Sequence, residues 1–294
     1  MEQKNKQFLG WIALDIDGTI TLDKFSVPDP VIAFLRECVE GGWRLAIATG
    51  RPLTYALKGL KQFDFPYLIL AQNGSILVEM PSKKILLRCY ISIARIQEIE
   101  RAFEGVVGDF VLFSGYENQD EIYWRPNRLD SEQRAYVENF ANYQGAPLNA
   151  VDSFDEIPLK SISLVKCFGA QCEMKRIVTN LSGNDHFNST ILRDPHAENY
   201  YLLLISDQTA SKGQTLWKTI DLFGPRGTII AAGDDENDAS LLEAADIKIA
   251  MAHAPESLMR VAHIVAPPTS EHGIIHALQF ALKNIKNQIA IFLI

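Results

Sequence analysis

Residues 11–19 read WIALDIDGT, an apolar run that leads into two aspartates and a Gly-Thr turn. The apolar run predicts a buried strand, and in open α/β sheets ligands bind at the carboxyl ends of the strands. Asp15 and Asp17 are two residues apart, so their side chains lie on one face of an extended segment. Carboxylates this close need a cation or a shared proton. The stretch therefore predicts a divalent-metal site in which one carboxylate is free to attack an electrophile.

Strand and helix signals alternate at both ends of the chain, which predicts right-handed βαβ units and a parallel sheet. We therefore expect an α/β fold with a Rossmann-like, doubly wound parallel-sheet core. The strands are expected near 11–16, 44–48, 67–71, 227–232 and 247–250, and the helices near 29–40, 52–61, 212–223 and 238–245.

The middle of the chain has a different pattern, in which helices are mixed with short strand pairs. Its helices are expected near 93–104, 131–142 and 171–181, and its strands near 109–114, 121–125, 161–168, 188–193 and 199–206. This mixture predicts an inserted α+β cap domain. We expect residues 1–83 and 207–294 to form one core domain, interrupted by a cap over residues 84–206.

Composition narrows the classes of function. The chain has 294 residues, 47% of them hydrophobic, and a net charge of −8, which argues against nucleic acid or an anionic membrane as the main partner. A small phosphorylated substrate remains compatible, because a metal or lysine reverses the charge locally. The four scattered cysteines fit a reducing compartment, and no apolar run reaches the roughly 20 residues of a spanning helix. We expect a cytoplasmic protein with no membrane partner; its oligomeric state is left open.

Further chemistry-bearing residues fall where predicted strands end or helices begin. Together with the acidic turn, they resemble in order and spacing the haloacid dehalogenase-like (HAD) phosphatases of the Cof type, which carry a large α/β cap. The resemblance runs through the whole chain and is specific, because all the motifs occur in order. The matching motifs are Asp15-Ile-Asp-Gly-Thr19, Ala48-Thr-Gly-Arg51, Asn73-Gly74, Ser211-Lys-Gly213 and Gly233-Asp-Asp-Glu-Asn-Asp238.

The resemblance implies a reaction and its metal. Asp15 is expected to be the nucleophile that forms an aspartyl-phosphate, and Asp17 the acid and base for the leaving oxygen and the water. Mg²⁺ is the expected cofactor, because it cancels the repulsion between a carboxylate and a phosphoryl dianion. Its expected ligands are Asp15, the backbone carbonyl of Asp17, and Asp234, with Asp238 binding the metal or holding its waters.

The resemblance also assigns substrate contacts. Thr49 and Gly50 are expected to face a phosphoryl oxygen, and Lys212 to pair with Asp15 and the transferring group. Asn237 is expected to orient the phosphoryl group or Lys212. Arg51 is expected to contact either the substrate or an acidic side chain.

Ordinary structural interpretations compete with these roles. Asp17 before glycine suits a turn, and Thr49 suits the N-cap of the helix that begins near Pro52. Most lysines between serine and glycine, such as Lys212, are simply exposed, and an acid-rich turn over residues 233–238 suits a solvated helix start. The co-occurrence of all the motifs favours the functional interpretation.

One turn departs from the family pattern. After Met251 the family usually has Gly-Asn-Ala, whereas this chain has Ala252-His253-Ala254. His253 is expected to be an exposed loop residue or a substrate contact. In the cap, an aromatic and basic cluster either faces a substrate or belongs to the cap surface; it consists of Tyr123, Trp124, Arg125 and Arg128.

The sequence thus predicts a Mg²⁺-dependent phosphatase that acts on a small phosphorylated metabolite such as a sugar phosphate, nucleotide or cofactor phosphate. The cap is expected to close over Asp15, exclude water and select the leaving group. A phosphomutase with the same nucleophile is the nearest alternative. A phospho-accepting signalling module is less favoured, because such modules lack an acid/base carboxylate two residues after the nucleophile.

Overall fold

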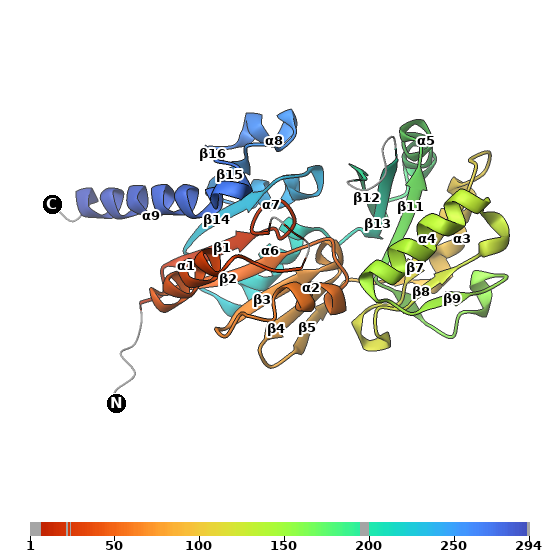
Figure 1. Ribbon diagram of the computed structural model, residues 1–294, viewed down its shortest axis with the longest axis horizontal. Coiled ribbons are helices and arrows are strands. Elements are labelled where there is room, and N and C mark those ends of the chain that lie inside the picture. Colours follow the sequence, from red (N-terminus) through yellow and green to blue (C-terminus); the bar gives the residue numbers. More distant parts are fainter. Residues whose placement is uncertain (1–6, 22, 24, 195–199, 293–294) are drawn as a thin grey trace.

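The computed structural model describes residues 7–21, 23, 25–194 and 200–292. Within these residues the larger of two main sheets has the order β16-β15-β14-β1-β2-β3-β4-β5 (Figure 1). The strands from β16 to β3 are parallel, so the predicted α/β fold with a parallel-sheet core is confirmed. The strands are β1 (Gly10–Leu14), β2 (Trp43–Ala48), β3 (Tyr67–Ala71), β4 (Ile76–Met80), β5 (Lys84–Arg88), β14 (Thr228–Gly233), β15 (Ile247–Met251) and β16 (Ile264–Ala266).

Helices cover both faces of this sheet. Successive side chains of each strand point to opposite faces, and both sets are apolar, so both faces need to be buried. Ile12 and Leu14 of β1 pack in one cluster with α1, α2 and α9, whereas Trp11 and Ala13 pack with α6 and α7. Among the described residues, no helix combines the length and apolarity needed to cross a membrane. The helices are α1 (Asp29–Glu40), α2 (Leu53–Gly59), α6 (Lys212–Phe223), α7 (Ala239–Glu243), α8 (Glu256–Val261) and α9 (Gly273–Phe292).

The hairpin of β4 and β5 is a feature that sequence analysis missed. Both strands run antiparallel at the edge of the larger sheet, and only a short 3-10 turn, Gln72–Gly74, separates β3 from β4. The half-exposed β5 lacks the continuous apolar run of the parallel strands. The structure therefore places residues 84–88 in the core sheet, although the expected cap begins at residue 84.

The second sheet lies beside the first and has the order β12-β13-β11-β7-β8-β9 (Figure 1). Helices α3 and α5 pack on one face of this sheet and α4 packs on the other. We call this body the cap. Its elements are α3 (Ile96–Ala102), β7 (Phe110–Phe113), β8 (Ile122–Trp124), α4 (Ser131–Gln144), β9 (Leu148–Ala150), β11 (Leu164–Gly169), α5 (Gln171–Leu181), β12 (Phe187–Arg193) and β13 (Tyr201–Asp207), with the small pair β6 (Ile91–Ser92) and β10 (Ser161–Ile162) below.

Hydrogen bonds fasten the cap to helix α2 of the core. The Asp120 carboxylate accepts bonds from the backbone N–H and the hydroxyl of Thr54, each at 2.8 Å. Thr54 lies in the first turn of α2, where backbone N–H groups have no acceptor within the helix. Lys58 of the same helix donates to the carbonyl of Gln144 at the end of α4. These contacts set the α4 face of the cap toward the carboxyl ends of the core strands.

The aromatic and basic cluster of the cap does not face the cavity between cap and core. Arg125 is buried, donates two hydrogen bonds to Asp109 at 2.6 and 2.7 Å, and pairs with Glu100. Its guanidinium also lies 3.9 Å from the centre of the Phe154 ring. Arg128 is exposed. The structure therefore favours the structural interpretation of this cluster over substrate binding.

We expect Arg125→Met to lower the free energy of unfolding by about 3–5 kcal/mol, because it strands the buried Asp109 charge. Urea denaturation followed by circular dichroism measures this change. The control Arg128→Met removes an exposed arginine from the same loop and should stay within about 0.5 kcal/mol of wild type. Equal effects of the two variants would contradict the assignment of Arg125 to the cap interior.

Candidate active site

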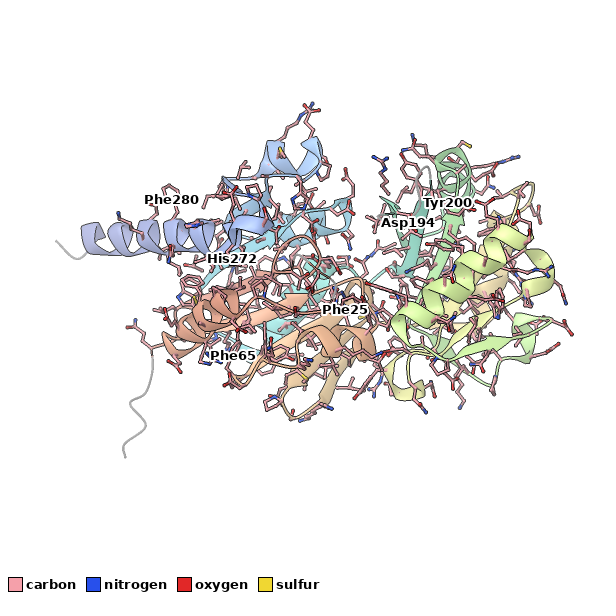
Figure 2. All side chains as sticks on the ribbon, in the orientation of Figure 1. Phe25, Phe65, Asp194, Tyr200, His272 and Phe280 are labelled. Atoms are coloured by element: carbon pink, nitrogen blue, oxygen red, sulfur yellow. The ribbon has the colours of Figure 1, made fainter. Side chains whose placement is uncertain are left out.

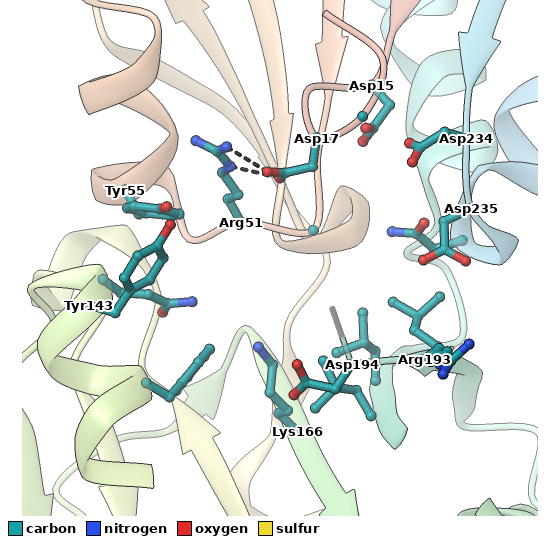
Figure 3. A pocket seen from close by; sticks show the side chains of 18 of the residues that line it. Asp15, Asp17, Arg51, Tyr55, Tyr143, Lys166, Arg193, Asp194, Asp234 and Asp235 are labelled. Atoms are coloured by element: carbon teal, nitrogen blue, oxygen red, sulfur yellow. Dashed lines mark hydrogen bonds and ion pairs between the residues drawn. The ribbon is translucent and has the colours of Figure 1, made fainter. Parts of the chain in front are cut away.

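The acidic side chains converge because two neighbouring parallel strands end at the same edge of the core sheet. Strand β1 leads into Asp15, and β14 leads into Asp234. Strands β1 and β14 pair in register, and the N–H of Asp15 extends the ladder by donating to the carbonyl of Ala232 at 3.0 Å. Figure 3 shows Asp15 and Asp234 side by side at one end of the cavity that separates core and cap.

Lys212 joins this pair from helix α6. Its ammonium donates to Oδ1 of Asp15 and to Oδ1 of Asp238, both at 2.6 Å. The Lys212 side chain is 1% exposed, so the alternative of a merely exposed lysine is excluded. The other Asp238 oxygen accepts the backbone N–H groups of Asp234 and Asp235, which fixes the turn after β14.

Burial and charge act against each other in this cluster. Burial raises the pKa of Asp15 well above its usual range, and Lys212 opposes that shift. Burial raises the pKa of Asp238 in the same way, again opposed by Lys212. Burial alone would lower the pKa of Lys212, but the two carboxylates outweigh it and raise that pKa. The ammonium therefore stays charged at neutral pH and favours the ionised form of both neighbouring carboxylates.

An acidic cluster that could hold a cation lies beside this ion pair. One carboxylate oxygen each from Asp15, Asp234 and Asp238 lies within 4.8 Å of the others. Asp234 accepts a bond from the Thr19 hydroxyl and lies 3.1 Å from Nε2 of His253. His253, in the turn that departs from the family pattern, is thus a neighbour of an acidic residue, and Asp234 raises its pKa.

The turn after β1 has to be glycine at position 18. Gly18 has φ +74°, and a Cβ at this position would overlap the Asp234 carboxylate. Its carbonyl accepts a hydrogen bond from the Thr269 hydroxyl. Glycine at position 18 therefore lets the turn after β1 pack directly against Asp234, which any residue with a side chain would prevent.

Asp17 is the acidic partner of Arg51, a choice that the sequence left open. Both of its carboxylate oxygens accept bonds from Arg51, at 2.6 and 2.7 Å. The Arg51 guanidinium is buried, whereas the Asp17 side chain is 47% exposed and lines the cavity. Arg51 also lies 4.6 Å from the centre of the Tyr55 ring. Asp17 therefore faces the cavity while Arg51 fixes its orientation (Figure 3).

Of the expected substrate contacts, Gly50 and Asn237 line the cavity. Thr49 is fully buried beside them, and its hydroxyl accepts the N–H of Arg51 at 3.1 Å. Pro52, not Thr49, occupies the N-cap position of α2, so the helix-cap interpretation of Thr49 is wrong.

Several cavity residues were missed by sequence analysis. Asp235 lines the cavity beside Asp234, and burial raises its pKa to about 6. The opposite wall comes from the cap, and its residues carry no motif because they meet only through folding. The cavity measures about 380 Å³, within the range of small-molecule sites. The cap contributes Tyr136, Phe140, Tyr143, Gln144, Lys166, Leu192, Arg193, Asp194, Leu202 and Leu204.

Comparison with known proteins identifies relatives along nearly the whole chain. Residues 12–278 match the family described as haloacid dehalogenase-like hydrolase. The putative phosphatase YxeH of Bacillus subtilis is 24% identical over 278 residues, 91% of this chain and 96% of that protein. A phosphoglycolate phosphatase of Methanopyrus kandleri is also 24% identical, over 93% and 97%. The structure of a haloacid dehalogenase-like hydrolase from B. subtilis superposes with a TM-score of 0.75 at 22% identity, covering 92% and 99%.

We expect Lys212→Met to lower the free energy of unfolding by about 3–5 kcal/mol at neutral pH, because buried Asp15 and Asp238 lose their counterion. The stranded carboxylates then bind protons more tightly in the folded than in the unfolded state. The deficit relative to wild type should therefore shrink as pH falls from about 7 to about 5. Urea titrations at both pH values measure it.

Lys61→Met, an exposed lysine of the core, is the matched control and should change stability by less than about 0.5 kcal/mol at either pH. A Lys212→Met protein as stable as wild type at neutral pH would contradict the buried ion-pair network.

Proposed function

Because the chain belongs to the haloacid dehalogenase-like hydrolases of the Cof type, and is a phosphoric monoester hydrolase, we propose that it hydrolyses a small phosphorylated metabolite through an aspartyl-phosphate on Asp15. The observation that carries the proposal is the position of Lys212, 2.6 Å from both Asp15 and Asp238 and behind the cavity floor. A buried cation aimed at a carboxylate nucleophile is what transfer of a phosphoryl dianion requires.

The acidic cluster fits a Mg²⁺ ion by its donor chemistry. Mg²⁺ prefers carboxylate, carbonyl and water oxygens, and one carboxylate oxygen each from Asp15, Asp234 and Asp238 lies within 4.8 Å of the others. Asp15, Asp234 and the backbone carbonyl of Asp17 would hold it directly. Both Asp238 oxygens already accept hydrogen bonds, so Asp238 is better placed to hold a metal-bound water. When bound, Mg²⁺ supplies charge that cancels the repulsion between Asp15 and the phosphoryl oxygens.

The reaction has two steps, formation of the aspartyl-phosphate and its hydrolysis by water, and residues around the cavity act in both. Asp15 attacks phosphorus in line with the leaving oxygen and becomes phosphorylated. Asp17 donates a proton to that leaving oxygen and later accepts one from the attacking water. Arg51 donates to both Asp17 oxygens, so Asp17 releases at least one of these hydrogen bonds before it donates a proton. Lys212, Thr49, Gly50 and Asn237 surround the transferring phosphoryl group.

The substrate fits in the cavity shared with the cap, which excludes water and contacts the leaving group. Curated relatives include phosphatases for phosphoglycolate and for 5-amino-6-(5-phospho-D-ribitylamino)uracil, both small phosphorylated metabolites. All four cysteines are free thiols, which is compatible with action in the cytoplasm. The proposal involves neither nucleic acid nor a membrane.

We expect Asp15→Asn to lower phosphate release from p-nitrophenyl phosphate by about a thousandfold or more, because the amide cannot form an acyl-phosphate. The control Asp221→Asn, which removes an exposed carboxylate of α6, should retain turnover, and circular dichroism checks that both variants fold. A wild-type rate of turnover by Asp15→Asn would contradict the assignment of Asp15 as the nucleophile. If p-nitrophenol forms with little inorganic phosphate, the phosphoryl group passes to another acceptor and the protein is a phosphomutase.

Metal dependence gives a separate expected result. Dialysis against EDTA should abolish turnover, and Mg²⁺ should restore it, because the carboxylate nucleophile and the phosphoryl dianion repel each other without a cation. Asp234→Asn should raise the Mg²⁺ concentration for half-maximal rate by at least about tenfold. Magnesium titration of the steady-state rate measures both. Full activity in the presence of EDTA would contradict the metal site.

A further inference from the structure

The cap wall of the cavity is largely apolar and contains two buried charged residues. Tyr136, Phe140, Leu192, Leu202 and Leu204 form the apolar part, on the face of the cap sheet that α4 covers. The charged residues on this wall are Lys166 on β11 and Asp194 directly after β12, 7% and 5% exposed. Arg193 also reaches the cavity but is exposed to solvent.

Lys166 is held in place by aromatic rings and has a free donor. Its ammonium lies 3.9 Å from the centre of the Phe140 ring and 5.6 Å from that of Phe113. Across the part of the chain that the structure describes, its nitrogen forms no hydrogen bond or ion pair, although Asp194 lies close enough to act on it electrostatically. In Figure 3 this nitrogen points into the cavity, toward the core wall that carries Asp17. The nitrogen borders the cavity, so a ligand bound there can supply its acceptor.

Asp194 lies next to Lys166 and offers a hydrogen-bond acceptor, whereas Lys166 offers a donor. Its carboxylate accepts a hydrogen bond from the Tyr136 hydroxyl, which fixes the side chain against α4. Figure 2 shows Asp194 on the side of the cap that faces the core, and Figure 3 shows it beside the Lys166 side chain. Burial lowers the pKa of Lys166 to about 7, with Asp194 opposing the shift, so the amine carries less than a full charge near neutral pH.

We propose that Lys166 and Asp194 determine which leaving group the enzyme accepts, by binding a hydroxyl group of the substrate between them and disfavouring leaving groups that end in an anion. This inference rests on the proposed phosphatase function and specifies its substrate. A hydroxyl group accepts a hydrogen bond from Lys166 and donates one to Asp194 at the same time. A carboxylate or phosphate in that place has no hydrogen to donate to Asp194, and its oxygens would repel the Asp194 oxygens.

Three six-carbon phosphomonoesters test the proposal, because they share the phosphoester and differ in what lies beyond it. D-Sorbitol 6-phosphate carries hydroxyl groups, hexyl phosphate carries none, and 6-phosphogluconate carries hydroxyl groups and a terminal carboxylate. Phosphate release from each gives kcat/KM. Wild type should favour sorbitol 6-phosphate over both of the others.

Two variants change opposite halves of the proposed contact. Lys166→Met and Asp194→Asn should each reduce the preference for sorbitol 6-phosphate over hexyl phosphate by about tenfold, the contribution of a hydrogen bond to a charged group. Asp194→Asn should in addition raise kcat/KM for 6-phosphogluconate relative to sorbitol 6-phosphate. The control Lys175→Met, an exposed lysine of α5, should leave every ratio unchanged.

The possible failures are distinguishable. Activity with unchanged ratios in both variants overturns this inference and leaves the proposed function in place. A wild-type preference for 6-phosphogluconate also overturns it, because Lys166 would then bind an anion. No phosphate release by wild type from these three esters or from p-nitrophenyl phosphate overturns the proposed function, and this inference with it.

Discussion

The buried ion pair between Lys212 and two aspartates is the constraint on which the site depends. Lys212 begins helix α6, Asp15 follows β1 and Asp238 ends the turn after β14, so three separate segments must meet for its charge to be balanced. A buried ammonium left with only one carboxylate, or with neither, would cost several kcal/mol. The same contacts that satisfy Lys212 bring Asp15 and Asp234 to the cavity floor. Stability and reactivity therefore rest on one cluster.

The core and the cap contribute different parts of the site, and their packing explains the difference. Parallel strands end together and thus gather carboxylates at one edge, which suits a metal and a phosphoryl group. The cap sheet instead presents to the cavity a largely apolar face, on which Lys166 and Asp194 are the two buried charged residues. Such a division lets the phosphoryl chemistry stay constant in the core while substitutions at Lys166 and Asp194 alter the choice of leaving group.

The sequence predicted the core well because its chemistry lies at strand ends, where motif and fold coincide. The turn over residues 15–19 and the acid-rich turn after β14 were both identifiable from apolar runs that stop at aspartates. The hairpin of β4 and β5 was missed; β5 is half-exposed and lacks the continuous apolar run of the parallel strands. The Asp17–Arg51 pair and the cap wall were not predictable, because they depend on how distant segments pack. Lys166 looks in sequence like any strand lysine.

Chemical identification of the phosphorylated residue tests the central claim most directly. The Asp17→Asn variant should accumulate the intermediate, because it slows water attack, so it is mixed with p-nitrophenyl [³²P]phosphate and quenched in acid during turnover. Peptide mapping should then place the label on the peptide that contains Asp15, and the double variant that also carries Asp15→Asn should remain unlabelled. Label on any other residue, or turnover with no labelled protein, would contradict the account.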